Sequence, residues 1–266
     1  NTESYKQEIV SVRETLMQKS RDYGEKISDP QKRGLIDYMN NSDEGYNYYG
    51  YYKDKDKLFS IWNHCTIYIP TLVPEKTLNY YRKTVQYGLI EQDYEKVTSE
   101  IDKAMKYLAD GKYSHEPIIF KTFFSMAEVM AKLQHEPETN YFYNARVIDD
   151  ILKMQQLLDN HKLGDILLLK GVNAYYAKKK DDVYYSFKEA YKHYSAGETS
   201  RYWIKKDLLE ENIQYTFTEL GIYKTGYDMS FLPAECRQPL TIFENDLSIA
   251  SGIQRTGDLH LNLPLI

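Results

Sequence analysis

The sequence contains few of the residues that interrupt helices or cross-link small folds. Its 266 residues include only 13 glycines, 8 prolines and 2 cysteines. Low glycine and proline contents favour long helices over a turn-rich all-β fold. The two cysteines, Cys65 and Cys236, are too few for a disulfide framework or a zinc site, although the sequence leaves a single bridge between them open.

Long apolar runs and a strong net charge are also lacking. The longest apolar run, Ile166–Leu169, is far shorter than the roughly 20 residues that cross a bilayer, so we expect no membrane span. The formal net charge of −5 argues against nucleic acid as the main partner. The first residue is Asn1 rather than methionine, which leaves two locations open: the cytoplasm, or an extracytoplasmic compartment after removal of a signal segment.

Tyrosine is the residue that the sequence has in excess, with 27 copies. The remaining composition, 42% hydrophobic and 27% charged, is typical of a globular protein. A tyrosine side chain has an apolar ring and a polar tip, so it suits both half-buried helix seams and ligand-lining surfaces. We interpret most of these tyrosines as sealing the seams between helices.

Residues 163–196 carry the most specific pattern in the chain. Small, apolar and aromatic residues recur there at helical spacing on two successive segments: Leu167, Gly171, Ala174 and Tyr175, then Val183, Phe187, Ala190 and Tyr194. Gly171 and Ala190 allow two helices to approach closely and leave space for Phe187. This pattern resembles the tetratricopeptide repeat, a pair of antiparallel helices.

A weaker copy of the pattern lies upstream, within 77–109. Val97, Ile101 and Ala104 there occupy the places of Val183, Phe187 and Ala190. The copies are 86 positions apart (183 minus 97), which is not a multiple of the usual repeat period of about 34. We therefore predict an all-α fold, an irregular array of antiparallel helical hairpins that is either a tetratricopeptide-like solenoid or another helical bundle.

Amphipathic stripes and helix start signals predict where the individual helices lie. The predicted helices span about 2–24, 30–39, 54–69, 75–90, 93–109, 117–134, 140–159, 163–178, 181–195 and 198–223. The polar run Asn40–Gly45 predicts a loop. The helices form one predicted domain, 1–223, followed by a tail, 224–266, that contains a short helix and an extended apolar end packed on the domain.

Most catalytic templates are absent, since the sequence has no glycine-rich phosphate loop, paired-histidine motif or Gly-x-Ser-x-Gly turn. Arg255 and His260 have the spacing of some helical ribonucleases but lie in a glycine-bearing tail. Cys65 falls on an apolar stripe, as a buried structural cysteine does. His115 and His135 each stand just before a proline that starts a helix, and no local spacing adds further metal ligands. We expect no enzymatic activity, no cofactor and no metal.

The tetratricopeptide resemblance implies a concave groove, lined by the first helix of each hairpin, that binds a peptide or an extended protein segment. The groove-facing positions would be Asn79, Arg82, Gln86, Leu89 and Ile90 upstream, and Asp165, Leu168, Val172, Tyr175 and Tyr176 downstream. The candidate partner contacts are Asn79, Arg82, Gln86, Tyr175 and Tyr176. Amide side chains can hydrogen-bond a peptide backbone, and an arginine can hold a carboxylate. The alternative is an ordinary solvated helix face.

Three function classes compete. The preferred one is a binding module for a peptide or protein partner, one version of which is the sensor part of a peptide-responsive regulator. The second is a structural protein that forms a homo-oligomer when residues 228–266 dock onto a neighbouring copy. The third is an enzyme with a dispersed helical active site, such as a hydrolase or nuclease.

Overall fold

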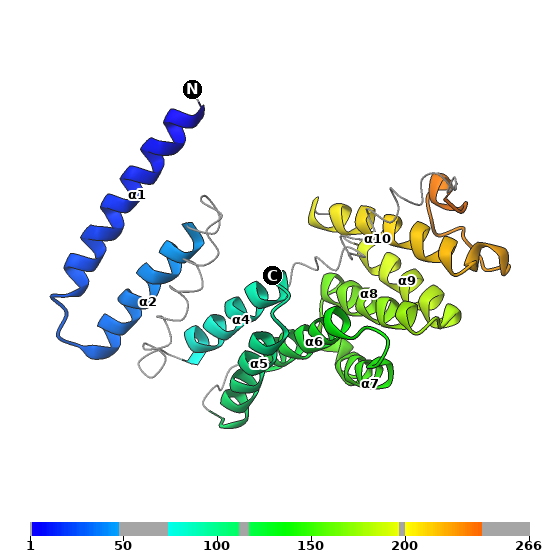
Figure 1. Ribbon diagram of the computed structural model, residues 1–266, viewed down its shortest axis with the longest axis horizontal. Helices are drawn as coiled ribbons and strands as arrows, with labels where there is room; N and C mark the ends of the chain where they lie inside the picture. Colours follow the sequence, from blue (N-terminus) through cyan, green and yellow to red (C-terminus); the bar gives the residue numbers. More distant parts are fainter. Residues whose placement is uncertain (1, 48–73, 112–116, 197–199, 241–266) are drawn as a thin grey trace. The chain divides into compact units, whose positions relative to one another are not determined.

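The computed structural model describes residues 2–47, 74–111, 117–196 and 200–240 (Figure 1). These residues form helices joined by turns, and none of them belongs to a strand. The predicted all-α fold is therefore confirmed. The chain divides into two compact units, Asn1–Thr84 with Gly111–Ser114, and Val85–Asp110 with His115–Ile266. We call them unit 1 and unit 2.

Unit 1 contains α1 (Thr2–Gly24), α2 (Pro30–Asn47) and the first part of α4 (Pro74–Ile90). α1 and α2 pack as an antiparallel pair (Figure 1). Asp29 starts α2, because its Oδ1 accepts a hydrogen bond from the backbone N–H of Lys32 at 3.3 Å. Among the described residues of this unit, the buried apolar ones are Tyr38, Leu78, Tyr80 and Tyr81.

The predicted loop at 40–45 is wrong, because α2 continues through these residues to Asn47. Asn, Ser, Asp and Gly lower helix stability by only about 0.5–1 kcal/mol each relative to alanine. Once the first turns of α2 have formed, extending the helix over such residues costs little. The predicted helix at 54–69, with Cys65, lies outside the described residues.

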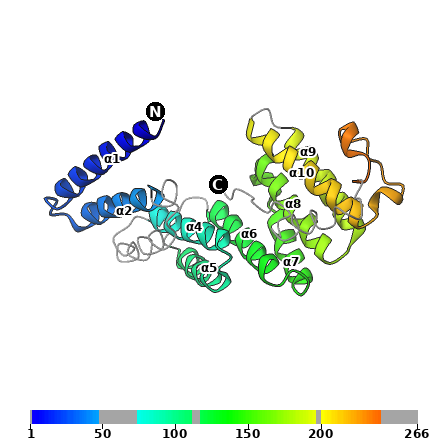
Figure 2. The ribbon, with the colours of Figure 1, turned by 45° about the horizontal axis from the view of Figure 1, so that its top comes forward.

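Unit 2 is built from α5 (Tyr94–Ala109), α6 (Pro117–His135), α7 (Tyr141–Leu152), α8 (Asn160–Tyr176), α9 (Lys180–Ser195) and α10 (Ser200–Glu219). Each of the helices from α5 to α10 packs on the next along the chain, and α8 and α9 form the most extensive pair. α8, α9 and α10 lie side by side (Figure 2). α8 consequently has neighbours on several sides, and twelve of its seventeen residues are buried.

Short side chains set the spacing of the hairpins. A Cβ added to Gly171 would lie 2.1 Å from Cε1 of Phe187, and one added to Gly164 would lie 2.3 Å from Cε1 of Tyr194. In the upstream copy, a Cβ on Gly88 would lie 2.6 Å from Cγ2 of Val97. The predicted close approach at Gly171 is thus confirmed, and glycine is needed there because a larger side chain would meet an aromatic ring.

Two helix ends in unit 2 differ from prediction. The helix expected over 140–159 ends at Leu152 and is followed by a 3₁₀ turn, Gln155–Leu157, before Asp159 caps α8. The helix expected to reach 223 ends at Glu219, and Gly221 then adopts a φ of 66°. Left-handed backbone of this kind commonly ends a helix.

Residues 220–240 pack against α10. They include two 3₁₀ turns, Ile222–Lys224 and Ala234–Cys236. The Tyr223 hydroxyl donates to the Cys236 carbonyl at 2.8 Å, and Gln214 of α10 donates to the Glu235 carbonyl at 2.9 Å. Cys236 is a buried cysteine with a free thiol among the described residues, and Cys65, the other half of the bridge that the sequence leaves open, lies outside them. The predicted short helix after Leu240 and the extended end, with Arg255 and His260, lie outside the described residues.

Candidate functional site

Three of the predicted partner contacts lie on α4. Asn79, Arg82 and Gln86 follow one another at spacings of three and four, so they share one side of this helix, and each is partly exposed. Pro74 and Glu75 start the helix, in keeping with the preference for proline and acidic residues in the first turn. The structure therefore places this predicted set on a continuous and partly accessible helix face.

Arg82 is the unusual member of the set. Its Nε is buried and has no hydrogen-bond partner in the described part of the chain. Burial lowers the pKa of the guanidinium from its ordinary value, and the nearby Tyr38 hydroxyl opposes that shift. A partly buried cation with an unused donor attracts a carboxylate, which can bind a guanidinium through two parallel hydrogen bonds.

Two other side chains of unit 1 also have unused polar atoms. Asn40 on α2 is 8% exposed, and Thr77 on α4 is fully buried. Neither Nδ2 of Asn40 nor Oγ1 of Thr77 has a hydrogen-bond partner among the described residues. Buried polar groups are rarely left unpaired. Together with Arg82, they make unit 1 rich in unsatisfied donors.

The downstream candidates lie in unit 2, and four of the five predicted groove-facing positions there are interior. Asp165, Leu168, Val172 and Tyr175 are buried, and Tyr176 alone keeps part of its surface exposed. Because α8 packs against α7, α9 and α10, the side expected to line a groove is largely covered. The ring of Tyr176 meets that of Tyr175 edge-on, with centroids 5.3 Å apart.

Tyr175 is held by a carboxylate from α10 and by a lysine from the turn that follows α8. Its hydroxyl donates to Oε2 of Glu219 on α10, and Nζ of Lys178 lies 3.2 Å from the other oxygen of Glu219 and 4.7 Å above the Tyr175 ring. Burial, with a further contribution from Glu219, raises the pKa of Tyr175 far above its ordinary value. Tyr175 thus links α8 to α10.

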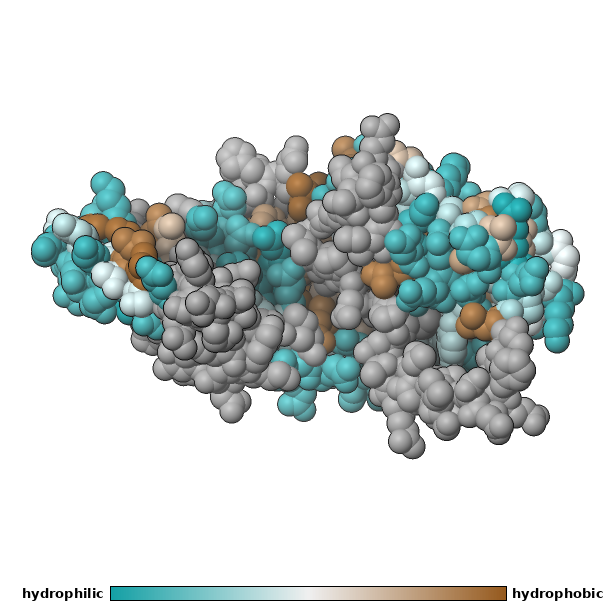
Figure 3. All heavy atoms as spheres, turned by 90° about the horizontal axis from the view of Figure 1, so that it is seen from above, coloured by the Kyte–Doolittle hydropathy of each residue, from teal (hydrophilic) through white to brown (hydrophobic). Residues whose placement is uncertain are grey.

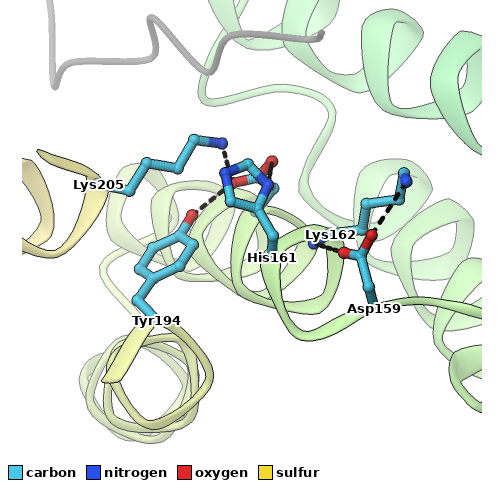
Figure 4. Close-up of polar contacts among 6 residues, drawn as sticks. Asp159, His161, Lys162, Tyr194 and Lys205 are labelled. Carbon is cyan, nitrogen blue, oxygen red and sulfur yellow. Dashed lines mark hydrogen bonds and ion pairs between the residues drawn. The ribbon is translucent and has the colours of Figure 1, made fainter. Parts of the chain in front are cut away.

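A set of ionisable side chains from three helices is buried in unit 2 (Figure 4). We call it the Asp165 cluster, and its members are His161 and Asp165 on α8, Tyr194 on α9 and Lys205 on α10. Oδ1 of Asp165 accepts hydrogen bonds from the Tyr194 hydroxyl, at 2.6 Å, and from Nζ of Lys205. Nδ1 of His161 lies 3.5 Å from Oδ2 of Asp165.

The Asp165 cluster suits a structural role better than an acid–base role. Its four residues are at most 8% exposed, so solvent and substrate have little access to them. Lys205 neutralises the charge of Asp165, and Tyr194 supplies a second donor to it. Burial, followed by the charge of Asp165, raises the pKa of Tyr194 well above its ordinary value, so the phenol remains protonated. The cluster ties three successive helices together through one carboxylate.

Sequence reasoning named Asp165 but missed its partners. The available signal was an aspartate inside the otherwise apolar segment 163–169, one turn after His161. An acidic residue in such a segment is rarely buried without a cation. No local pattern identifies Lys205 as that cation, because it lies 40 residues further along the chain.

Tyrosine hydroxyls bind carboxylates throughout unit 2. Six such bonds connect described residues: Tyr141–Asp182, Tyr143–Glu128, Tyr175–Glu219, Tyr191–Glu210, Tyr194–Asp165 and Tyr227–Asp181. Each joins two different helices or, for Tyr227, joins the segment after α10 to α9. This pattern supports the interpretation that tyrosines seal the seams between helices.

A small pocket of about 180 Å³ lies near the start of α5 and the end of α6. It is lined by Gln92, Tyr94, Val97, Ala131, Gln134 and His135. The His135 ring stacks on Tyr94, with centroids 4.3 Å apart. The described residues contain no group of three histidine, cysteine or acidic side chains placed to hold a metal ion. His115 lies outside them.

None of the described helices is both long enough and apolar enough to cross a membrane. No protein-family model, curated protein or solved structure matches this chain. Its function therefore has to be argued from the geometry of its own residues.

Proposed function

We propose that this chain is a non-enzymatic helical scaffold that binds a peptide or protein partner, and that Arg82 holds a carboxylate of that partner. The supporting observation is the buried Nε of Arg82, which has no hydrogen-bond partner among the described residues. A hydrogen bond to a charged group contributes about 1.5–3 kcal/mol, so a carboxylate that bonds to this Nε would gain binding free energy of that order.

The neighbours of Arg82 on α4 suit a peptide ligand. Asn79 lies one turn before Arg82 and Gln86 one turn after it, and both are partly exposed. A side-chain amide can donate to a backbone carbonyl and accept from a backbone N–H, so it binds the main chain whatever the peptide sequence. The resemblance to tetratricopeptide hairpins, in which the first helix faces the ligand, supports the same assignment for α4.

The burial of most of α8 reduces the number of candidate partner contacts in unit 2. Tyr175 and Asp165 are buried and already bind other side chains of this chain, so we assign them to the scaffold. Tyr176 keeps exposed surface and remains a candidate contact in unit 2. The ionisable side chains of the Asp165 cluster give no support to an enzyme, because they are shielded from substrate.

Peptide selection tests the proposal. A random peptide library with free C-terminal carboxylates would be selected against the full chain, and the affinities of the selected peptides measured by fluorescence anisotropy. Arg82→Gln is expected to weaken binding at least tenfold, since 1.4 kcal/mol corresponds to a factor of ten. If the C-terminal carboxylate is the group bound, amidating it should have a similar effect and should add little in the Arg82→Gln variant.

Lys76→Gln is the matched control, because it removes one positive charge from α4 at a position about a third of a turn around the helix from Arg82. This variant should bind within about twofold of the unaltered chain if the effect is local rather than long-range. Equal affinities of the Arg82→Gln variant and the unaltered chain for every selected peptide would contradict the assignment. Recovery of no binding peptide at all would also count against it.

A further inference from the structure

α1 exposes a row of apolar side chains. Val12, Leu16 and Tyr23 are 55%, 60% and 68% exposed. Figure 3 shows apolar atoms at its left edge, the side on which α1 and α2 lie in Figure 1. Exposed apolar side chains that gather in a row along one helix can mark a surface that another chain covers.

This row is separate from the side of α1 that packs on α2. Among the α1 residues whose burial is described, the better-covered ones are Met17, Ser20, Arg21 and Gly24, which recur at helical spacing. At 3.6 residues per turn, the row through Val12, Leu16 and Tyr23 lies roughly a third of a turn away from them. α2 therefore leaves the row uncovered.

The row has the spacing of a coiled-coil seam. Positions 5, 9, 12, 16, 19 and 23 alternate steps of four and three and carry Tyr, Ile, Val, Leu, Lys and Tyr. A strict heptad row of this kind is narrower than the stripe of a helix that faces a globular core, and it fits a second helix with the same row. The row runs over almost three heptads, close to the length expected of a short coiled coil.

The charges of α1 favour its own copy as that second helix. α1 carries four acidic and four basic residues, so two copies have no net repulsion. In the heptad register of the sequence, Glu8 and Arg13 occupy the two kinds of position that flank a seam, and they are five residues apart. In a parallel pair this spacing brings opposite charges together between chains, whereas an antiparallel pair centred on the row brings Arg13 beside its own copy.

We propose that two copies of this chain associate through α1 as a parallel pair, with Val12 and Leu16 of one copy against the same residues of the other. Lys19 is the one charged residue in the row. A single charged seam position lowers the stability of a coiled coil but restricts its register. This surface is distinct from the partner site proposed at Arg82, and it does not depend on that site.

The mass of the full chain in solution, measured by sedimentation equilibrium over a range of concentrations, tests this proposal. The unaltered chain is expected to shift from monomer to dimer. Leu16→Asp puts a charge into the seam and should raise the dimer dissociation constant at least a hundredfold. Because Leu16 is already 60% exposed, this variant should keep the helical content of the unaltered chain, which circular dichroism would check.

Ser11→Asp is the matched control, since it adds the same charge at an exposed position on another side of α1 and should leave the dimer intact. A chain that is monomeric at every concentration would overturn the proposal. A dimer that is unaffected by Leu16→Asp would also overturn it, because its interface would then lie elsewhere.

The orientation has its own test. A Val12→Cys variant, oxidised and analysed by peptide mass spectrometry, should form a disulfide between the two copies of position 12. A parallel seam places these positions opposite each other, whereas an antiparallel seam offsets them. Formation of the dimer without this cross-link would contradict the parallel arrangement.

Discussion

At the scale of single residues, the buried charges of the Asp165 cluster are the most demanding feature of unit 2. Lys205 and Asp165 are 4% and 6% exposed. A buried ion pair often adds little net stability compared with well-packed apolar residues, but removing one partner leaves an uncompensated charge in the interior. Removing one member of the pair should therefore destabilise the fold by more than the intact pair stabilises it.

We predict that Lys205→Met lowers the free energy of unfolding by about 3–5 kcal/mol, because Asp165 would remain buried without its cation. Urea unfolding followed by circular dichroism would measure the loss. The double variant Lys205→Met, Asp165→Leu should recover most of it, since both charges are then gone. A single variant within about 1 kcal/mol of the unaltered chain, the usual range for a weak surface pair, would show that the charge is not isolated from solvent.

The sequence predicted the position of individual site residues only where neighbours along the chain determine it. Asn79, Arg82 and Gln86 could be grouped because they lie on one side of one helix. The partner of the Tyr175 hydroxyl could not be foreseen, because Glu219 lies on another helix, 44 residues further along the chain. The unused Nε of Arg82 also depends on tertiary packing, which no spacing along the chain reveals.

At the scale of elements, the hairpins are matched by size. Gly171 faces Phe187, and Gly164 faces Tyr194. The two glycines of α8 thus leave space for the two aromatic rings of α9. The upstream copy has larger residues on the first helix and smaller ones on the second, with Val85 and Ile101 at the corresponding places.

We predict that Gly171→Ala destabilises unit 2 by about 1–3 kcal/mol, the usual cost of overpacking, because the new methyl group would meet the Phe187 ring. Phe187→Leu should also destabilise the unit, by leaving space. The double variant Gly171→Ala, Phe187→Leu should lose less stability than the two single losses add up to. Urea unfolding of the unaltered chain, the two single variants and the double variant would measure this. Strictly additive losses would mean that the two residues do not share this contact.

Helix starts were predicted better than helix ends. Pro74, Pro117 and the caps Asp93 and Asp159 mark starts that the structure places within a few residues of the prediction. These residues act through their own backbone or through bonds three residues away, so their effect is visible in sequence. The ends at Asn47 and Leu152 were missed because packing and cooperativity, rather than local propensity, decide how far a helix extends.

At the scale of the whole molecule, the tyrosine–carboxylate bonds make the packing of unit 2 sensitive to alkaline pH. The pKa values of Tyr141, Tyr143 and Tyr223 are raised to about 12, in each case chiefly by burial. Hydrogen bonds to Asp182 and Glu128 add to the effect for Tyr141 and Tyr143. The folded chain therefore retains phenol protons that the unfolded chain releases near pH 10.

The sign of the resulting pH dependence follows from linkage. Stabilisation from these raised pKa values is complete below about pH 10 and is lost as the pH rises to about 12, because the unfolded state releases its protons first. We predict that the urea midpoint falls across this interval. Tyr141→Phe should make the fall shallower, and this comparison separates tyrosine from lysine titration. If the urea midpoint of this variant falls just as steeply, groups other than Tyr141 cause the loss of stability.

The two glycines of α8 also restrict how unit 2 can move. Gly164 and Gly171 are seven residues apart, as are Phe187 and Tyr194, so each ring fits its glycine in only one alignment of α8 and α9. Sliding the helices by one turn would push both rings against side chains. Shear between these two helices is thereby blocked, and any opening of this part of the chain has to occur as a hinge at the connections between helices.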